Sequence, residues 1–378
     1  TEARKQELIE QAGHVIAAEI IPRYVGMIEL FVSLLPLSDP HAGIWRIPQG
    51  EQIYAARLKS FTTTNMSAEE IHQLGLREVA RISEEMENIL TGEGIIEGSV
   101  SSRLRQLMDI PEYHFEDSDK GRAEQIAYLY NLDDKMMKMA QRFFITIPSQ
   151  TLKIVRVPEF AQDGSALGYY RGPAMDGSTS GRFYINQKDM SDTPRWTLPT
   201  LMYHEGAPGH HFQISVSHLI ENLPLIRKVS PFTAYVEGWA LYAEFIAHND
   251  MNVYEDDPLG NLGRLQDEML RAIRLVVDTG MHAKRWSRER AIEYMLSNSG
   301  TTEADATREI ERYAVWPGQA TAYKVGQLHI LKLRSMAELR LGDGFDLREF
   351  HEMILMNGAM PLEILTESVQ LWIESQIR

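Results

Sequence analysis

The feature that most constrains the fold of this chain is a succession of helix-type segments that runs from Leu198 nearly to the C-terminal end. Apolar residues recur there at helical spacing, and glycine or proline separates most of the segments. The segments expected to be helical are 198–220, 232–249, 258–285, 287–298, 302–314, 318–340, 347–356 and 361–377. A chain of 378 residues, 44% of them hydrophobic, can bury a large core, so the sequence predicts a mostly α protein.

The N-terminal part is also expected to be largely helical. Residues 1–35 show helical spacing with a break near Pro22. Ser67 followed by Glu70 is a capping-box pattern, which predicts that a long helix begins there. Residues 36–66 carry several prolines and glycines and are expected to be irregular.

Three short β-type runs interrupt the helical pattern in the middle of the chain. They are residues 151–157, 167–170 and 182–186. No internal repeat, low-complexity segment or convincing linker is found, so a single domain over residues 1–378 is predicted, with a small sheet between two helical parts. The N-terminal helical part, the sheet and the C-terminal helical part comprise residues 1–145, 146–190 and 191–378.

The charge and cysteine content exclude several classes of function. The net charge is −15 and no basic stripe is found, which argues against binding to nucleic acid and to anionic membranes. There is no cysteine, so any metal must be held by His, Asp or Glu. No uninterrupted run of 18 apolar residues is found, and we expect no stable membrane insertion.

The sequence leaves the compartment and the oligomeric state open. The first residues, Thr1 to Lys5, lack the apolar core of a signal peptide and an initiator Met. We therefore expect a soluble chain that is either cytoplasmic or exported. An exported chain would be a periplasmic protein or a lipoprotein precursor whose leader has been removed.

Histidines gather in one segment beside a glutamate. The segment reads Tyr203-His204-Glu205-Gly206-Ala207-Pro208-Gly209-His210-His211-Phe212-Gln213. A familiar zinc-binding helix carries two histidines at i and i+4, with a glutamate after the first as general base. Position i+4 from His204 is Pro208, whereas His210 is at i+6 and His211 at i+7. A straight helix therefore does not easily bring two of these imidazoles onto one ion.

Pro208 suggests how the extra residues are absorbed. It cannot donate a hydrogen bond to the carbonyl of His204, and Gly206 and Gly209 add backbone freedom. We therefore expect a bulged or opened turn that returns either His210 or His211 to the position of the second ligand. The alternative is that the histidines only stabilise a proline-kinked helix. Three histidines and a glutamate around one break favour a metal site.

A second cluster supplies a third candidate ligand. The cluster reads Tyr235-Val236-Glu237-Gly238-Trp239-Ala240-Leu241-Tyr242-Ala243-Glu244. A short connection makes its helix an antiparallel neighbour of the histidine segment, so Glu237 can face the histidines. Glu244 lies on the same helical face and is a candidate partner for a ligand histidine. The alternative, a solvent-facing glutamate, is weaker for Glu237, which stands among Val, Gly and Trp.

Together, His-Glu-Gly-x-Pro-Gly-His-His and the later Glu-Gly-Trp-Ala-Leu-Tyr-Ala-Glu resemble the bacterial family called domain of unknown function 885, over about residues 40–378. That family looks related to the gluzincin peptidases, such as thimet oligopeptidase, angiotensin-converting enzyme and carboxypeptidase Taq. The resemblance implies a gluzincin-like helical fold with the small sheet beside an active-site cleft. It also implies one zinc ion held by His204, His210 and Glu237, with Glu205 as general base. Family members are usually longer at the N-terminus, so a fragment or a short form is expected.

The resemblance extends to the segment around Tyr323. In related peptidases a tyrosine on a late helix donates a hydrogen bond to the developing oxyanion, which a neutral phenol suits. Tyr323 is the matching residue and Tyr313 is the second candidate. The alternative is a packed core tyrosine that bonds to the backbone.

One helix carries a polar stripe in apolar surroundings. Arg274, Asp278 and His282 follow one another at intervals of four residues. Since buried charge must be paired, the favoured interpretation is an internal Arg274–Asp278 pair. In the other interpretation Arg274 holds a substrate carboxylate, with His282 near the catalytic centre.

The strand that ends at Asn186 is expected to lie at the edge of the sheet beside the cleft. Gluzincins pair such an edge with the peptide backbone of the substrate. Asn186 and Tyr184 are then candidate substrate contacts. The alternative is a purely structural hairpin.

The sequence thus predicts zinc-dependent hydrolysis of peptides by a single metallopeptidase-like domain, with no nucleic-acid partner. Two histidines and a carboxylate also form the ligand set of non-haem iron enzymes, so an iron or manganese enzyme is one alternative. Glu205 has no required role in that chemistry. The other alternative is a catalytically inactive peptidase-like protein that binds peptides or a partner.

Overall fold

The computed structural model describes residues 1–229 and 232–377 and divides into two compact units. The first unit is Thr1–His41 and the second is Ala42–Arg378. The single domain predicted over residues 1–378 therefore corresponds to two units, and the larger one begins at Ala42. Among the predicted parts, the N-terminal one is divided at His41, and the sheet and the C-terminal helical part lie within the second unit.

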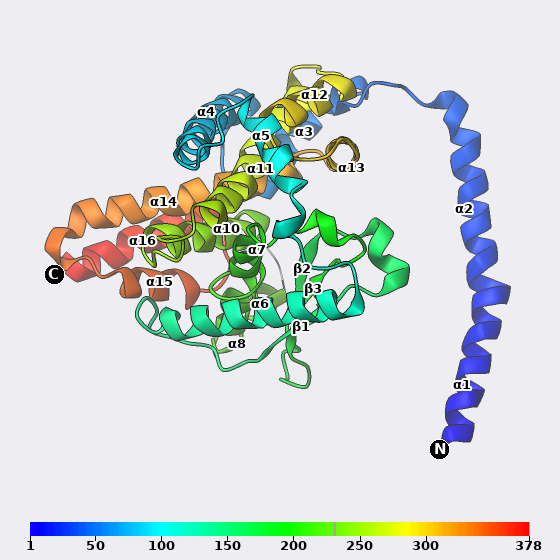
Figure 1. Ribbon diagram of the computed structural model, residues 1–378, viewed down its shortest axis with the longest axis horizontal. Coiled ribbons are helices and arrows are strands. Elements are labelled where there is room, and N and C mark those ends of the chain that lie inside the picture. Colours follow the sequence, from blue (N-terminus) through cyan, green and yellow to red (C-terminus); the bar gives the residue numbers. More distant parts are fainter. Residues whose placement is uncertain (230–231, 378) are drawn as a thin grey trace. The chain divides into compact units, whose positions relative to one another are not determined.

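The first unit is helical (Figure 1). Helix α1 (Glu2–Val15) passes through a π-helical turn at Ile16–Ile20 into α2 (Ile21–Leu34). The turn lies where a break was predicted, because Pro22 cannot donate to the preceding turn and a wider turn accommodates its ring.

One stretch among the described residues, Glu2–Leu37, is long and apolar enough to cross a membrane, judged by length and composition alone. No membrane-spanning helix was predicted from the sequence, because only uninterrupted runs of apolar residues were counted. Glu2–Leu37 is interrupted by polar residues but contains an 18-residue segment that is apolar on average. A signal sequence and the core helix of a soluble protein pass the same test, although none of this apolar stretch is buried.

The second unit consists mainly of helices, with one small sheet (Figure 1). Every helix predicted from Leu198 onward is present within a few residues, and the first of them is split in two. The mostly α fold is confirmed. The helices are α3 (Gly50–Thr62), α4 (Ala68–Gly92), α5 (Val100–Met108), α6 (Asp119–Ala140), α7 (Leu198–Glu205), α8 (His210–His218), α9 (Leu225–Val229), α10 (Thr233–Asn249), α11 (Pro258–Ala283), α12 (Arg288–Asn298), α13 (Glu303–Val315), α14 (Ala322–Leu341), α15 (Leu347–Leu355) and α16 (Leu362–Ile377).

Local signals determine where several helices begin. Ser67 accepts a hydrogen bond from the backbone of Glu70, and the Glu70 side chain accepts from Ser67, so the predicted capping box is confirmed at the start of α4. Residues 36–66, expected to be irregular, contain α3 instead. Tyr54 and Leu58 point into the core one turn apart, and the prolines of this region precede the helix.

The sheet has three strands in the order β1-β3-β2. Strand β3 (Gly181–Ile185) pairs in parallel with β1 (Leu152–Arg156) and antiparallel with β2 (Gly168–Arg171). The prediction of an edge strand that ends at Asn186 is therefore wrong, and the edges are β1 and β2. Alternate residues of β3 are fully buried, which suits a central strand.

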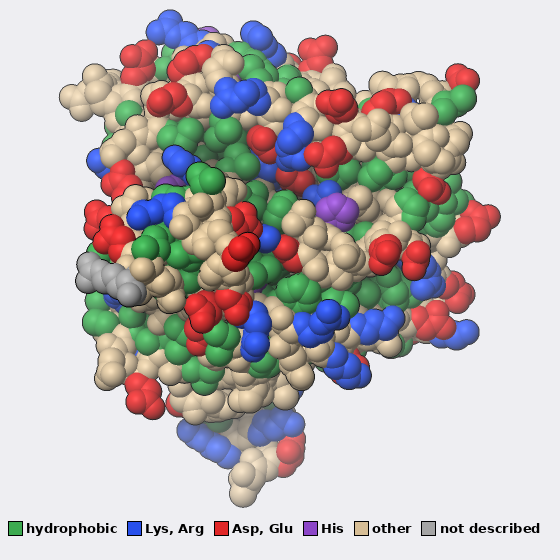
Figure 2. Space-filling model, turned by 90° about the vertical axis from the view of Figure 1, so that its left-hand side faces the viewer, with side chains coloured by type: hydrophobic (Ala, Val, Ile, Leu, Met, Phe, Trp, Pro, Cys, Tyr) green, Lys and Arg blue, Asp and Glu red, His purple; other side chains and the backbone are tan. Residues whose placement is uncertain are grey.

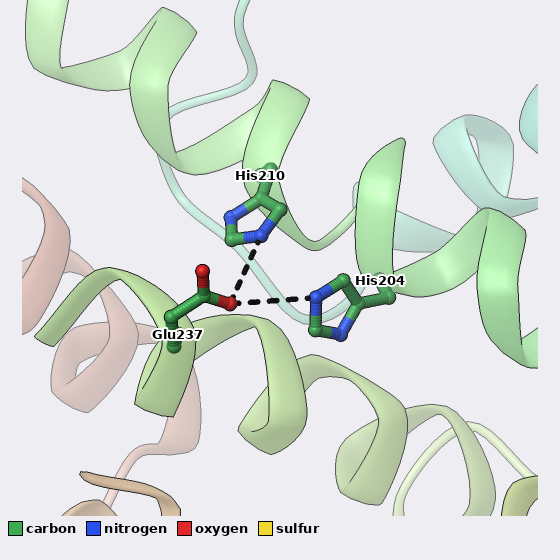
Figure 3. A group of neighbouring side chains, drawn as sticks. All are labelled: His204, His210 and Glu237. Atoms are coloured by element: carbon green, nitrogen blue, oxygen red, sulfur yellow. Dashed lines mark ion pairs between the residues drawn. The ribbon is translucent and has the colours of Figure 1, made fainter. Parts of the chain in front are cut away.

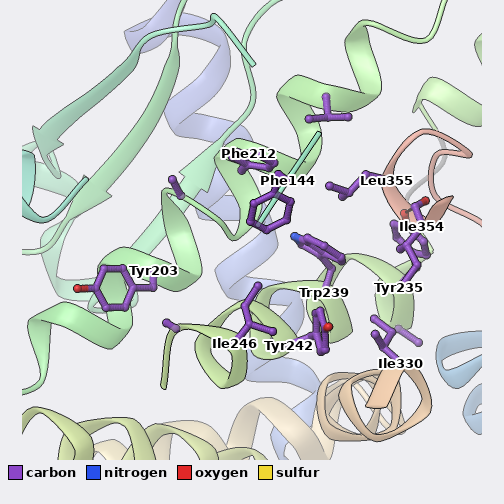
Figure 4. Close-up of a cluster of buried hydrophobic side chains, with 14 of the residues drawn as sticks. Phe144, Tyr203, Phe212, Tyr235, Trp239, Tyr242, Ile246, Ile330, Ile354 and Leu355 are labelled. Atoms are coloured by element: carbon purple, nitrogen blue, oxygen red, sulfur yellow. Dashed lines mark hydrogen bonds between the residues drawn. The ribbon is translucent and has the colours of Figure 1, made fainter. Parts of the chain in front are cut away.

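Helix α10 lies at the centre of the larger hydrophobic core. Its aromatic side chains Tyr235, Trp239 and Tyr242 are fully buried and pack beside Phe144 and Phe212 (Figure 4). The same helix packs against α7, α8 and α14. A second cluster forms where α11 packs along α4. On the face shown in Figure 2, acidic and basic side chains are interspersed.

Candidate metal centre

The histidine segment forms two short helices joined by a four-residue turn. Helix α7 ends at Glu205 and α8 begins at His210, so His204 and His210 are carried by different helices. The sequence predicted a bulged or opened turn in the helix that carries both histidines. The structure instead ends the first helix, because Pro208 cannot continue its hydrogen-bond pattern.

Close packing fixes this turn. A Cβ atom at Gly209 would lie 2.0 Å from the carbonyl oxygen of His204, so no larger residue fits there without a shift. Trp239 of α10 donates its indole N–H to the Pro208 carbonyl at 2.9 Å. Asp133 of α6 accepts a hydrogen bond from the Ala207 backbone at 3.3 Å. The core therefore holds the turn from two sides.

Three side chains from α7, α8 and α10 converge at this point (Figure 3). Glu237 Oε2 lies 3.6 Å from His204 Nε2 and 3.4 Å from His210 Nε2. The three ligand atoms all lie within 4.8 Å of one another. The predicted ligands are thus brought together in space.

The donor set and its spacing fit a tetrahedral divalent ion. Zinc bonds of about 2.0–2.1 Å place neighbouring ligand atoms about 3.4 Å apart. The separations at Glu237 Oε2 match that value and are too long for good hydrogen bonds. This buried oxygen has no hydrogen-bond partner, which an ion bound between the three side chains would supply.

Glu244 fixes the orientation of the first ligand. Its carboxylate accepts from His204 Nδ1 at 2.7 Å, which leaves the lone pair of Nε2 directed at the centre. Arg271 lies 3.9 Å from the same carboxylate oxygen. A buried carboxylate that orients a ligand imidazole is common in zinc sites, and the suggestion made for Glu244 from its helical face agrees with this contact.

The charges of the centre are strongly coupled. Burial opposes protonation of His204, but Glu237 and Glu244 raise its pKa to about 10. Burial likewise opposes ionisation of Glu237, yet His210 and His204 lower its pKa well below the usual range. Binding of a divalent ion to these side chains would therefore be expected to release a proton.

Glu205 faces the same centre without a partner. It is buried, and its Oε2 atom has no hydrogen-bond partner. Burial raises the pKa of its carboxyl group, while His204 and His210 act in the opposite direction. A carboxylate with a raised pKa beside a metal-ligand set suits a general base.

The contacts of His211 distinguish it from His210 as a candidate ligand. Its Nδ1 is bonded to the hydroxyl of Tyr170 at 2.9 Å, and its Nε2 to the carbonyl of Gln150 at 3.1 Å. Both nitrogens are therefore engaged away from the centre. His210 is the histidine that points at Glu237, and its Nδ1 is buried without a partner.

Tyr323 borders the centre from α14. Burial raises the pKa of its phenol, and the charge of Glu237 raises it further, so the two groups are near each other. The guanidinium of Arg274 stacks 4.7 Å from the centre of its ring. Tyr313, the second candidate, is fully buried and bonded to Glu309 and Arg274.

The polar stripe of α11 is mainly structural. Arg274 pairs with Glu309 at 2.9 Å, so the favoured internal pair with Asp278 is not formed. Asp278 instead accepts from the Tyr54 hydroxyl and the Gly318 backbone. His282 is fully buried, and its ring bonds to the backbone of Ile44 and Tyr313. Both ring nitrogens of His282 are therefore used within the fold, which argues against the predicted contact with a substrate.

Asn186 is also not available to a substrate. Its side chain is buried and donates to the carbonyls of Gln162 and Ser165 in the preceding loop. The prediction treated it as the end of an edge strand. The amide instead ties the loop between β1 and β2 to the central strand.

Tyr170, Gln150 and Asp133 were missed from the sequence. Tyr170 lies on β2, Asp133 on α6 and Gln150 in the loop before β1. All three precede the histidine segment by tens of residues, and none belongs to a motif. Burial raises the pKa of Tyr170, and the charge of Glu205 adds to the effect. Burial also raises the pKa of Asp133 to about 6.

Two surface pockets lie away from these residues. One, of about 810 Å³, is lined by residues of α5, α12 and α13. The other, of about 610 Å³, is lined by the end of α5, the loop that follows it and residues 189–191. Neither is lined by a residue of the centre. Among the described residues, the one group of potential metal ligands is His204, His210 and Glu237, and it lines neither of these two pockets.

A family of bacterial proteins of unknown function, DUF885, matches residues 1–369. The chain belongs to this family. The predicted membership is confirmed, and the match begins earlier than the expected residue 40. No curated protein matches the chain.

Two solved structures are similar to this DUF885 chain. A "putative lipoprotein" from Colwellia psychrerythraea is 43% identical, with a TM-score of 0.97 over 99% of this chain and 64% of its own. A "putative lipoprotein of unknown function" from Shewanella oneidensis is 21% identical, with a TM-score of 0.75 over 95% of this chain and 65% of its own. The second likeness shows the fold alone. The chain thus spans just under two thirds of the length of each relative.

Proposed function

We propose that this chain hydrolyses peptide bonds with the help of a zinc ion held by His204, His210 and Glu237. The observation that carries the proposal is the convergence of these three side chains beside Glu205, a buried carboxylate without a partner. The order of the two motifs, which resembles that of gluzincin peptidases, supports the same assignment. A non-haem iron site would give Glu205 no role.

Each residue of the centre has a defined task in the proposed reaction. When bound, zinc lowers the pKa of a water ligand and polarises the substrate carbonyl. Glu205 takes a proton from the attacking water and passes it to the leaving nitrogen. Tyr323, which its surroundings keep protonated, donates a hydrogen bond to the oxygen that becomes negative. Glu244 keeps His204 in the required tautomer.

The sheet suggests where an extended peptide lies. Strand β2 is an edge strand that packs against α7 and α8, which carry His204 and His210. A peptide that pairs with the sheet near the metal would therefore add to β2 and not to β3. The proposed substrates are accordingly peptides in extended conformation.

We also propose that the chain acts outside the cytoplasm. The two similar structures are of proteins described as "putative lipoprotein", and both extend beyond the region matched here. The apolar helical stretch Glu2–Leu37 has the length and composition of a membrane-spanning helix or a signal sequence. Fractionation of cells that express the protein from its natural gene tests this proposal.

The Glu205→Gln variant tests the proposed reaction. Gln keeps the shape of the side chain but cannot accept a proton, so kcat/KM for a peptide library followed by mass spectrometry should fall at least about 100-fold. The zinc content by elemental analysis should stay at that of the wild type, since Glu205 is not a ligand. Full activity of the variant would contradict the assignment.

Metal analysis discriminates the alternatives. Bound iron or manganese with no peptide cleavage would favour the non-haem enzyme. Absence of any stoichiometric metal at neutral pH, together with peptide binding, would favour an inactive peptidase-like protein. His204→Ala should lose the metal, whereas His211→Ala should keep the metal because its nitrogens face Tyr170 and Gln150.

A further inference from the structure

Tyr170 and His211 form a hydrogen-bonded pair beside the proposed centre that the roles above leave unused. Tyr170 lies on β2, opposite the buried Phe183 of β3, and therefore on the sheet face that packs toward the core. His211 directly follows the ligand His210 on α8. The Tyr170 phenol is also close enough to Glu205 for the charge of that carboxylate to act on it.

The direction of the hydrogen bonds in this pair is determined. The carbonyl of Gln150 can only accept, so His211 Nε2 must carry the ring proton that points to it. Both ring nitrogens contact neutral groups, and a buried imidazole in such surroundings is neutral. His211 Nδ1 therefore has a lone pair, and the Tyr170 hydroxyl donates its only proton to it.

A glycine makes this contact possible. A Cβ atom at Gly181 would lie 2.3 Å from the Tyr170 oxygen and 2.7 Å from His211 Nδ1. Any side chain at this position would push the pair apart. The arrangement thus depends on three separate elements, namely β2, β3 and α8.

Because its proton is engaged, Tyr170 cannot serve as a donor to the oxyanion, and its oxygen offers lone pairs instead. Peptide hydrolysis requires an acceptor as well as donors, because the scissile nitrogen carries an N–H that loses its solvent partner in a dry site. Glu205 is occupied with the proton of the attacking water.

We propose that the Tyr170 oxygen, oriented by His211, accepts the N–H of the scissile amide, so that the site selects amide substrates over esters. This inference rests on the proposed function. In the reaction the C–N bond breaks and the nitrogen receives a proton from Glu205, while the N–H bound by Tyr170 stays in place. Tyr170 is then a substrate-binding residue and His211 is a positioning residue.

A pair of tight-binding analogues tests the role without turnover. A peptide phosphonamidate carries P–NH at the scissile position, and the matched phosphonate carries P–O. Calorimetry on the zinc-loaded protein should show that the wild type binds the P–NH compound at least about tenfold more tightly, a difference of about 1.4 kcal/mol. Tyr170→Phe, which removes only the oxygen, should bind both compounds equally.

Two matched variants serve as controls. Tyr169→Phe changes the neighbouring tyrosine, which lies on the opposite face of β2 and stacks on Tyr184, and it should keep the wild-type preference. Ser215 has a fully buried hydroxyl near the same phenol and is the protein donor that would compete for its lone pairs. Ser215→Ala should keep or increase the preference.

The outcomes separate this inference from the proposed function. Tyr170 is not the acceptor if the wild type binds both compounds equally, or if Tyr170→Phe with normal zinc content keeps the preference for the P–NH compound. The proposed function stands in either case. If neither compound binds the zinc-loaded wild type, the proposed function fails and this role fails with it. The wild-type preference remains decisive even if Tyr170→Phe does not fold.

Discussion

At the scale of single residues, the proposed centre depends as much on the groups behind the ligands as on the ligands. The buried carboxylate of Glu244 bonds to His204 on the side away from Glu237. Removal of such a partner typically costs 10–100-fold in metal affinity. The matched contact for His210 is missing, since its Nδ1 has no partner. The orientation of His204 is therefore fixed more strongly than that of His210.

Glu244→Ala should weaken zinc binding about 10–100-fold, because His204 loses the acceptor that fixes its tautomer. Competition with a chromophoric chelator measures the effect. Glu338→Ala, which removes a glutamate paired with Arg334, is the control and should leave the affinity unchanged. Equal affinity of Glu244→Ala and the wild type would mean that packing alone orients His204.

His351 should make the fold sensitive to acid independently of the metal. It is fully buried between Tyr242, which donates to it, and the Phe143 carbonyl. Burial lowers its pKa to about 4, below the value of about 6.5 in the unfolded chain. Its contribution to stability is therefore complete above pH 6.5. That contribution is lost as the pH falls toward 4, up to about 3 kcal/mol.

Denaturant unfolding of the metal-free protein at pH 7 and pH 5 tests this expectation. The His351→Gln variant can still accept from Tyr242 and donate to Phe143 but cannot be protonated. It should lose less stability than the wild type between the two pH values. Parallel losses in the two proteins would assign the acid sensitivity to other groups.

Sequence reasoning named three proposed ligands that lie together in the structure, but it did not identify the partners of several charged residues. The spacing of Arg274 and Asp278 allowed a pair within one helix, yet Arg274 bonds to Glu309 of α13. Nothing local distinguishes His210 from His211, because the choice depends on Tyr170 and Gln150, which are distant in sequence. Such choices are made by tertiary contacts, and periodicity carries no information about them.

At the scale of elements, α10 and α14 meet at a pair of glycines. A Cβ atom at Gly238 would lie 2.5 Å from the Gly326 backbone, and one at Gly326 would lie 1.9 Å from the Ala234 carbonyl oxygen. This crossing brings α14, with Tyr323, close to Glu237, the residue before Gly238. The close approach of two backbones therefore helps to set the distance between the ligand and the proposed oxyanion donor.

Gly238→Ala should destabilise the protein by about 1–3 kcal/mol, because the added methyl group forces the two helices apart. Thermal unfolding measures the loss, and zinc affinity should fall with it because Glu237 moves. Gly92→Ala at the end of α4, where nothing lies within 4 Å, is the control and should be neutral or slightly stabilising. Similar behaviour of both variants would contradict a tight crossing.

Helices and strands were largely predictable because their signals are local. The capping box of Ser67 and the periodicity of α11 lie within the elements that they specify. Strand order was not predictable, since β3 comes last in the sequence but lies between β1 and β2, and only pairing with these two earlier strands places it there. The helix α3 was missed because the prolines of residues 36–48 outweighed a short apolar stripe.

At the scale of the whole molecule, the two units differ in how they use apolar residues. Both hydrophobic cores draw only on residues from Ala42 onward. The first unit has no buried residue, although its helical stretch is rich in isoleucine, leucine and valine. The stability of the second unit is therefore expected to be independent of the first.

Removal of residues 1–41 should leave a chain that folds cooperatively and binds zinc with unchanged affinity, since neither core nor the ligand set uses them. Thermal unfolding and elemental analysis of the shortened and full chains provide the comparison. The shortened chain should also be less prone to aggregation, because an exposed apolar helix is gone. A large fall in melting temperature would show that the two units stabilise each other.

The turn between α7 and α8 has a consequence for metal selectivity. When both histidine ligands lie on one helix, the helical pitch sets the angle between them at the metal ion. In the proposed site, the angle between the two histidine ligands would be set by the four residues that connect α7 and α8, which hydrogen bonds to Trp239 and Asp133 hold in place. Insertions, deletions or repacking in that connection would retune the coordination angle without touching a ligand, so evolution could adjust the preferred ion through a loop alone.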